Sequence, residues 1–103
     1  MNDLVGVAKS VGGVPIRLTE ERWQHIIEGH VDLANYYEDV INVIERPEAV
    51  FEGCRGSLIA VRSYGRRGHL GIFYREVSAD DGFVITARFL IREPRSRRVW
   101  PKT

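Results

Sequence analysis

Two of the three histidines in this chain lie close together, in the stretch TEERWQHIIEGHVDL. These are His25 and His30, and a histidine can bind a metal ion, carry a proton near neutral pH or fill a core. Zinc-binding helices of the His-Glu-x-x-His type place two rings one turn apart, whereas a five-residue spacing turns them about 140° apart. No cysteine pair and no third histidine at ligand spacing completes a metal site. We therefore expect neither a bound metal nor another cofactor.

Charge is divided unevenly along the chain. Residues 1–54 hold four cations and ten acids, a balance of −6, whereas residues 55–103 hold eleven cations and four acids, a balance of +7. Ten of those eleven cations are arginines, whose guanidinium group matches a phosphate with two hydrogen bonds. The second half therefore predicts a surface for a phosphate backbone. The alternative is a solvated sheet surface whose arginines form salt bridges with the acidic helices.

Histidine and arginine together suit the metal-free cleavage of RNA. A histidine can take the proton of a 2′-hydroxyl, and arginines can stabilise the charge that builds on the phosphate oxygens. The candidates are His25 and His30 on or just after the first helix, Arg75 on a strand, and Thr86 and Arg88 on one face of the next strand.

Two helices and a sheet are expected to position these residues. Thr19 predicts an N-cap, and the apolar spacing after it predicts a helix over 20–28 that stops at Gly29 in a left-handed cap. A second helix is predicted from about Tyr37, and Pro47 ends it. An extended piece is predicted at 12–18, where Pro15 is consistent with a sheet edge, and strands at 49–54, 57–64, 70–77 and 82–92.

The predicted fold is α+β, with two N-terminal helices packed on a roughly four-stranded antiparallel sheet. Residues 1–103 are expected to form a single domain, with a loose N-terminus at 1–13 and a basic tail at 93–103. Alternation in the last strand assigns Phe83, Ile85, Ala87, Phe89 and Ile91 to the core face, and Val84, Thr86, Arg88, Leu90 and Arg92 to the other face.

Composition excludes several classes of protein. With 44% hydrophobic and 28% charged residues, the chain is typical of a folded globular domain. No apolar run approaches the roughly 20 residues that cross a bilayer, and the N-terminus lacks the pattern of a secretory signal. The single cysteine, Cys54, cannot form an internal disulfide and is expected to pack in the interior. These features favour a cytoplasmic protein.

The order of the motifs resembles a known family. LTEERWQHIIEGHVDL, a helix ending in IERPEAVF, basic strands and a closing VITARF resemble the small nucleases of the barnase–EndoU–colicin–RelE fold, above all their phage-associated and toxin-like members. The resemblance covers about residues 16–91. It implies metal-independent RNA cleavage and an antitoxin or immunity protein as partner. Carried over by position, it points to His25, His30, Arg75 and Thr86 as catalytic residues.

Three hypotheses remain open. In the first, the chain is a ribonuclease of a toxin–antitoxin or phage-related system, and Arg88 joins Arg75 in holding the scissile phosphate. Further RNA contacts would come from Tyr64, by base stacking, and from the backbone-binding residues Arg62, Arg66 and Arg67. In the second, the same fold binds nucleic acid or a partner protein without catalysis. In the third, the histidines are structural, and His25, which flanks the apolar stripe, is the ring better suited to the core.

Overall fold

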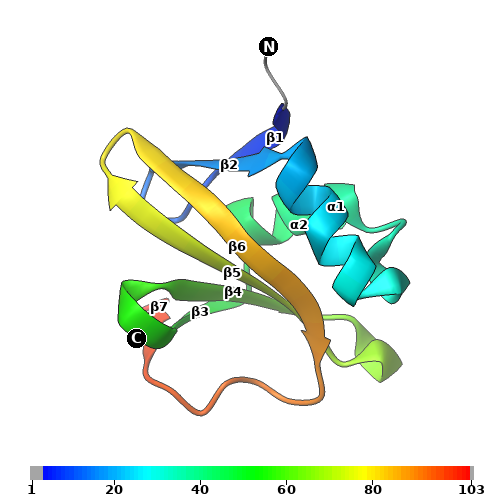
Figure 1. Cartoon of the computed structure of the whole chain (residues 1–103). Coiled ribbons are helices and arrows are strands. Elements are labelled where there is room, and N and C mark those ends of the chain that lie inside the picture. Colours follow the sequence, from blue (N-terminus) through cyan, green and yellow to red (C-terminus); the bar gives the residue numbers. More distant parts are fainter. Residues whose placement is uncertain (1–3, 103) are drawn as a thin grey trace.

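The computed structural model describes residues 4–102. In this part of the chain, seven strands form one sheet, and two helices follow the second strand (Figure 1). The strands are β1 (Leu4–Lys9), β2 (Pro15–Thr19), β3 (Ala49–Glu52), β4 (Leu58–Ser63), β5 (His69–Ser78), β6 (Asp81–Leu90) and β7 (Arg98–Trp100). The helices are α1 (Glu20–Gly29) and α2 (Tyr37–Glu45), and the 3-10 turns are η1 (Val31–Leu33), η2 (Cys54–Gly56) and η3 (Gly65–Arg67).

The sheet is mixed, in the order β1-β2-β6-β5-β4-β3-β7. β2 and β6 pair in parallel, and the other neighbours pair antiparallel. The predicted α+β class, the two helices and the strands β3 to β6 are confirmed. The prediction of four strands, all antiparallel and all after the helices, is wrong because β1, β2 and β7 join the sheet.

The N-terminus is ordered instead of loose. Residues 4–9, expected to be irregular, form β1 and pair with β2 through a turn in which Gly13 has a φ of 85°. Lys9 lies opposite Pro15, so β2 is not the edge strand that Pro15 suggested. Pro15 is tolerated because it is the first residue of β2, and pairing with β6 begins only at Ile16. Residues 1–3 of the predicted loose segment lie outside the described residues.

Both helices begin and end near the predicted residues. The Thr19 side chain accepts a hydrogen bond from the Arg22 N–H at 3.1 Å, which confirms the N-cap of α1. The predicted left-handed stop at Gly29 is wrong, because Gly29 lies inside the helix and His30 caps it by donating its N–H to the Ile26 carbonyl oxygen. α2 ends at Glu45, and its C-cap Arg46 lies directly before Pro47, as predicted.

One core joins both helices to the same face of the sheet. α1 packs against β1, β2 and β6, and α2 packs against β1, β4 and β5. Its largest fully buried side chains are Ile16, Leu18, Ile26, Leu33, Ile44, Leu70, Ile72 and Tyr74. A second, smaller cluster on the opposite, outer face contains Ala49, Phe51, Ile59 and Val61, with the half-buried Phe73 against it.

An extra residue in β6 decides which side chains face the helices. Phe73 of β5 pairs with Thr86, but the next residue, Tyr74, pairs with Val84, so Ile85 is a β-bulge. Val84 and Tyr74 are buried on the helix face, and Thr86 follows Phe73 to the outer face. The bulge thus breaks the strict alternation along β6.

The bulge corrects the predicted core face of this strand. Ala87 and Phe89 belong to the helix-facing core as predicted, but Val84, which was assigned to the other face, is also buried there. Ile85 turns outward, and Ile91 lies beyond the end of β6 and is 93% exposed. A period-2 pattern cannot reveal a bulge, because one inserted residue moves all the following side chains to the other face.

Close approach at Gly82 gives a first testable prediction. A Cβ added there would lie 2.5 Å from the Arg75 carbonyl oxygen and 2.6 Å from Ile16 Cδ1. We expect Gly82→Ala to lower the free energy of unfolding by about 1–3 kcal/mol, measured by urea denaturation. Gly29→Ala is the matched control, because nothing lies within 4 Å of its Cβ position and alanine favours a helix. Equal stability of the two variants would contradict the tight β2–β6 contact.

Candidate functional site

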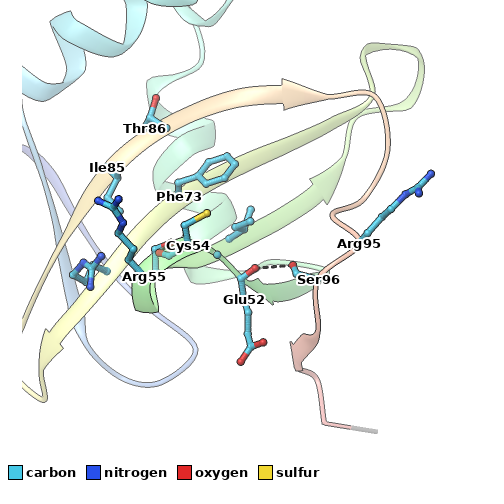
Figure 2. A pocket seen from close by; sticks show the side chains of 12 residues that line it. Glu52, Cys54, Arg55, Phe73, Ile85, Thr86, Arg95 and Ser96 are labelled. Atoms are coloured by element: carbon cyan, nitrogen blue, oxygen red, sulfur yellow. Dashed lines mark hydrogen bonds between the residues drawn. The ribbon is translucent and has the colours of Figure 1, made fainter.

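A pocket of about 650 Å³ opens on the outer face of the sheet, away from the core under the helices (Figure 2). Phe73, Ile59 and Ile85 form its apolar part, above the second cluster. The remaining lining residues are polar, small or charged: Glu52, Gly53, Cys54, Arg55, Ser57, Arg75, Thr86, Arg95 and Ser96. Strands β3 to β6, the turn η2 and the C-terminal segment therefore build the pocket together.

The η2 turn brings a thiol and a guanidinium group to the pocket. Arg55 has a left-handed φ of 55°, and Gly56 follows with a φ of 79°. The Ser57 side chain stabilises this turn by donating a hydrogen bond to the Cys54 carbonyl oxygen at 2.7 Å. Figure 2 shows the sulfur of Cys54 directed toward Phe73 and the Arg55 side chain extending toward Ile85. The expectation that Cys54 packs in the interior is wrong, because η2 carries it off the end of β3 to an exposed position.

The opposite side of the pocket is formed by the C-terminal segment. Ser96 donates a hydrogen bond to the Glu52 carbonyl oxygen at 2.6 Å (Figure 2). The Glu52 N–H donates to the Arg97 carbonyl oxygen at 2.9 Å. Arg97 also forms an ion pair with the Glu52 carboxylate at 3.0 Å, and its hydrogen bond lowers the pKa of Glu52. These contacts hold Arg95 at the rim, where its side chain points outward.

The arginines of the pocket have no acidic partners. Within residues 4–102, the two ion pairs are Arg17–Asp81 and Arg97–Glu52. Neither joins an arginine of the basic half to a helix, so the salt bridges to the acidic helices that the alternative interpretation requires are absent from this part of the chain. Arg55, Arg75 and Arg95 are therefore unpaired, and the rim of the pocket carries uncompensated positive charge.

Two residues of the predicted catalytic set, Arg75 and Thr86, line this pocket. The Arg75 guanidinium lies 3.5 Å from the position that a Cβ on Gly56 would take, so it stands beside the η2 turn. Thr86 lies at the margin, on β6. Arg88 is on the same face, with its guanidinium carbon 4.9 Å from the centre of the Phe73 ring.

The two helix histidines do not line the pocket. His25 is exposed on α1, beside a shallow depression that it shares with Thr19, Glu21 and Arg22, so the alternative hypothesis that placed it in the core is wrong. His30 is half-buried just after the helix. α1 packs against β6, the strand that bears Thr86, but on the face of the sheet opposite the pocket.

The remaining predicted RNA contacts lie at the end of the sheet near η3 and mostly have intramolecular partners. The Arg62 guanidinium donates to the main-chain oxygens of Asn42 and Arg46, which stabilises the C-terminus of α2. Arg67 lies over the rings of Tyr36 and Phe89, 5.1 Å from each centroid. Arg66 is exposed in η3.

Tyr64, expected to stack on a base, is held by its own neighbours. Its hydroxyl donates to Asp39 Oδ1 at 2.6 Å, and its ring makes edge contacts with Tyr36 and Phe89. Partial burial and the hydrogen bond to the Asp39 carboxylate raise the pKa of Tyr64 to about 12. The residue is therefore part of the packing between α2 and the sheet.

Sequence reasoning missed Arg55, Arg95 and Phe73 as site residues. The glycines that flank Cys54 and Arg55 indicated a turn, but the left-handed backbone that aims the two side chains was not foreseen. Arg95 reaches the rim only because the C-terminal segment returns to β3.

No group of three or more potential ligands in the described part of the chain could hold a metal ion. Among residues 4–102, none of the helices has the length and apolar character needed to span a membrane. Comparisons with protein families, characterised proteins and solved structures found no match to this chain.

The environment of Tyr64 predicts a loss of stability at alkaline pH. Tyrosine in the unfolded chain ionises near pH 10, below the raised pKa of about 12 in the folded protein. The contribution of Tyr64 is therefore complete below pH 10 and is lost as the pH rises toward 12. Tyr64→Phe should reduce this dependence, measured by urea denaturation between pH 9 and about 11.5.

Tyr37→Phe is the control, since Tyr37 is 40% exposed and its hydroxyl has no hydrogen-bond partner among the described residues. It should leave the pH dependence of the natural protein in place. If the stability of Tyr64→Phe and Tyr37→Phe depended on pH in the same way, the environment of Tyr64 would not be the cause of the alkaline loss of stability.

Proposed function

We propose that this chain is a small ribonuclease that cleaves RNA without a metal ion and holds its substrate on the outer face of the sheet. The observation that carries the proposal is the pocket beside Phe73, with the unpaired guanidinium groups of Arg55, Arg75 and Arg95 at its rim. Arginines without acidic partners attract a polyanion, and an apolar surface beside them suits a nucleobase. The likeness of the helix and VITARF motifs to the barnase–EndoU–colicin–RelE nucleases supports the same function.

Arg75 and Thr86 are proposed to act on the scissile phosphate. The guanidinium of Arg75 would form two hydrogen bonds with the phosphate and stabilise the negative charge of the pentavalent transition state. The Thr86 hydroxyl, at the pocket margin, would donate a hydrogen bond that orients the same group. Arg55 is proposed to share this role, because the η2 turn places it in the lining of the same pocket.

His25 and His30 are proposed as the proton carriers. α1 packs against β6, the strand that bears Thr86, on the face opposite the pocket. An RNA strand that leaves the pocket would reach this helix by passing around the part of β6 beyond Phe83, where β6 no longer pairs with β2. One ring would take the 2′-hydroxyl proton and the other would protonate the leaving oxygen. An antitoxin or immunity protein is proposed as the inhibitory partner, and the cytoplasm as the compartment.

The decisive test is RNA cleavage in a buffer that contains a chelator. We expect the refolded, inhibitor-free protein to cut a mixed RNA substrate, and Arg75→Ala to lower kcat/KM by about 100-fold or more because it removes a donor to the transition state. Arg92→Ala, a matched exposed arginine outside the pocket, should retain activity. The kcat/KM of Thr86→Val should lie between those of Arg75→Ala and Arg92→Ala. An intact RNA substrate with the natural protein would sink the proposal.

The histidines are tested in the same assay. Cleavage abolished in His25→Ala or His30→Ala, with an unchanged circular dichroism spectrum, would identify that ring as a proton carrier. Full activity in both variants would overturn the assigned role of the histidines and leave the arginine pocket as the site of catalysis.

A second candidate is a nucleic-acid-binding module without catalysis. The observation that favours it is the pocket lining, which includes no histidine among the described residues. RNA binding without cleavage would support this function. In that case Arg55→Ala and Arg75→Ala should each reduce the slope of log K against log salt concentration by about 0.7, the value for one phosphate contact with a single strand.

A further inference from the structure

We propose that the pocket receives one unstacked nucleotide, with its base against Phe73 and its phosphate at Arg55 and Arg75, so that the substrate is single-stranded and read with little preference for base. This inference rests on the proposed function, since it names the kind of RNA that the same site would take.

The position of Arg88 determines which side of Phe73 is open. Arg88 pairs with Gly71, two residues before Phe73 on β5, and its guanidinium covers the ring from that side. Arg88 does not line the pocket, whereas Arg75, two residues after Phe73, does. The pocket therefore lies against the other side of the ring, where a base could pack.

The chemistry of the lining fits a nucleotide better than a free anion or an apolar molecule. Ile59 and Ile85 continue the apolar surface beside Phe73, and the guanidinium groups stand at its margin. A volume of about 650 Å³ is ample for one nucleotide, and pockets for small ligands usually measure about 300–1,000 Å³. Bases in a duplex are stacked and paired, so a duplex could not present one to this surface without being opened.

The polar groups of the pocket offer little that could discriminate between bases. The hydroxyls of Ser57 and Ser96 already donate to the carbonyl oxygens of Cys54 and Glu52. The Glu52 carboxylate is paired with Arg97. With these groups engaged, a base would be held by stacking and by apolar contact, which every base can provide.

Tyr64 cannot take this role, although it was the residue predicted to stack on a base. Its hydroxyl is bonded to Asp39 and its ring is packed against Tyr36 and Phe89. Phe73 is half-buried and lines a pocket with unpaired arginines, so the structure offers it as the stacking residue.

Cys54 provides a reporter for the test, because it is the only cysteine of the chain and its thiol is exposed in this pocket. The rate of its alkylation by iodoacetamide, a neutral reagent, would be measured in chelator buffer with three probes. These are a 2′-O-methyl RNA oligonucleotide that cannot be cleaved, the same oligonucleotide annealed to its complement, and inorganic phosphate.

We expect the single strand to slow alkylation of Cys54 at least tenfold, and the duplex and phosphate to slow it less than twofold at the same phosphate concentration. Oligonucleotides of adenine, uracil or cytosine alone should differ from one another by less than about threefold in half-protecting concentration. Phe73→Leu, which keeps an apolar side chain but removes the ring, should raise that concentration about tenfold, in line with the loss of one stacking contact. Phe83→Leu is the control, because Phe83 lies on β6 outside the pocket lining.

Several outcomes would overturn the inference and leave the proposed function standing. Equal protection by the duplex would mean that the pocket reads the backbone alone, and equal protection by phosphate would mean a simple anion site. A strong preference for one base would contradict recognition by stacking. RNA cleavage without any protection of Cys54 would leave the ribonuclease activity standing but place its substrate outside this pocket. The absence of both cleavage and RNA binding would instead overturn the proposed function itself.

Discussion

The single extra residue in β6 is the constraint on which the outer face depends. Val84 is buried beneath the helices, and in a regular strand Thr86 and Arg88 would follow it to that side. Burial of an unpaired guanidinium in this core would destabilise the fold, because a buried charge loses the free energy of its hydration unless an opposite charge or hydrogen bonds replace it. The bulge at Ile85 sends Thr86 and Arg88 outward while Ala87 and Phe89 continue the core. Both the core and the pocket therefore rely on the same local irregularity.

A sheet with apolar residues on both faces follows from the composition of its central strands. β3, β4 and β5 contain consecutive apolar residues, such as Ile59, Ala60 and Val61, so both faces of these strands avoid water. The helices cover one face. The helices leave the other face open, while the C-terminal segment borders it at Glu52 and β7 extends the sheet by pairing with β3. The apolar surface around Phe73 stays uncovered, and an uncovered apolar surface of this kind can receive a ligand without displacing any part of the fold.

Local patterns predicted the parts of the fold that depend on neighbours in sequence. The helices α1 and α2 were predicted from the Thr19 N-cap, the apolar spacing and Pro47. The strands β3 to β6 were predicted from their apolar runs. β7 and the interior position of β2 were missed because they depend on pairing with strands distant in sequence, and β1 was missed although its partner β2 is the next strand of the chain. The same division holds for the site: Arg75 and Thr86 could be placed from strand positions, whereas Arg55 depends on a left-handed turn and Arg95 on contacts with Glu52. Helical spacing located the histidines but could not relate α1 to the outer face.

The parallel contact between β2 and β6 also determines when the molecule can fold. Ile16 pairs with Gly82, so the first third of the chain finds its place in the sheet only after β6 has been made. Contacts this distant in sequence form slowly and favour folding after synthesis is nearly complete. A nascent chain that lacks β6 also lacks Thr86. In such a chain β5, the strand that carries Arg75, has no β6 to pair with. The pocket face is thus completed late, and a growing chain lacks the finished surface that we propose to bind RNA.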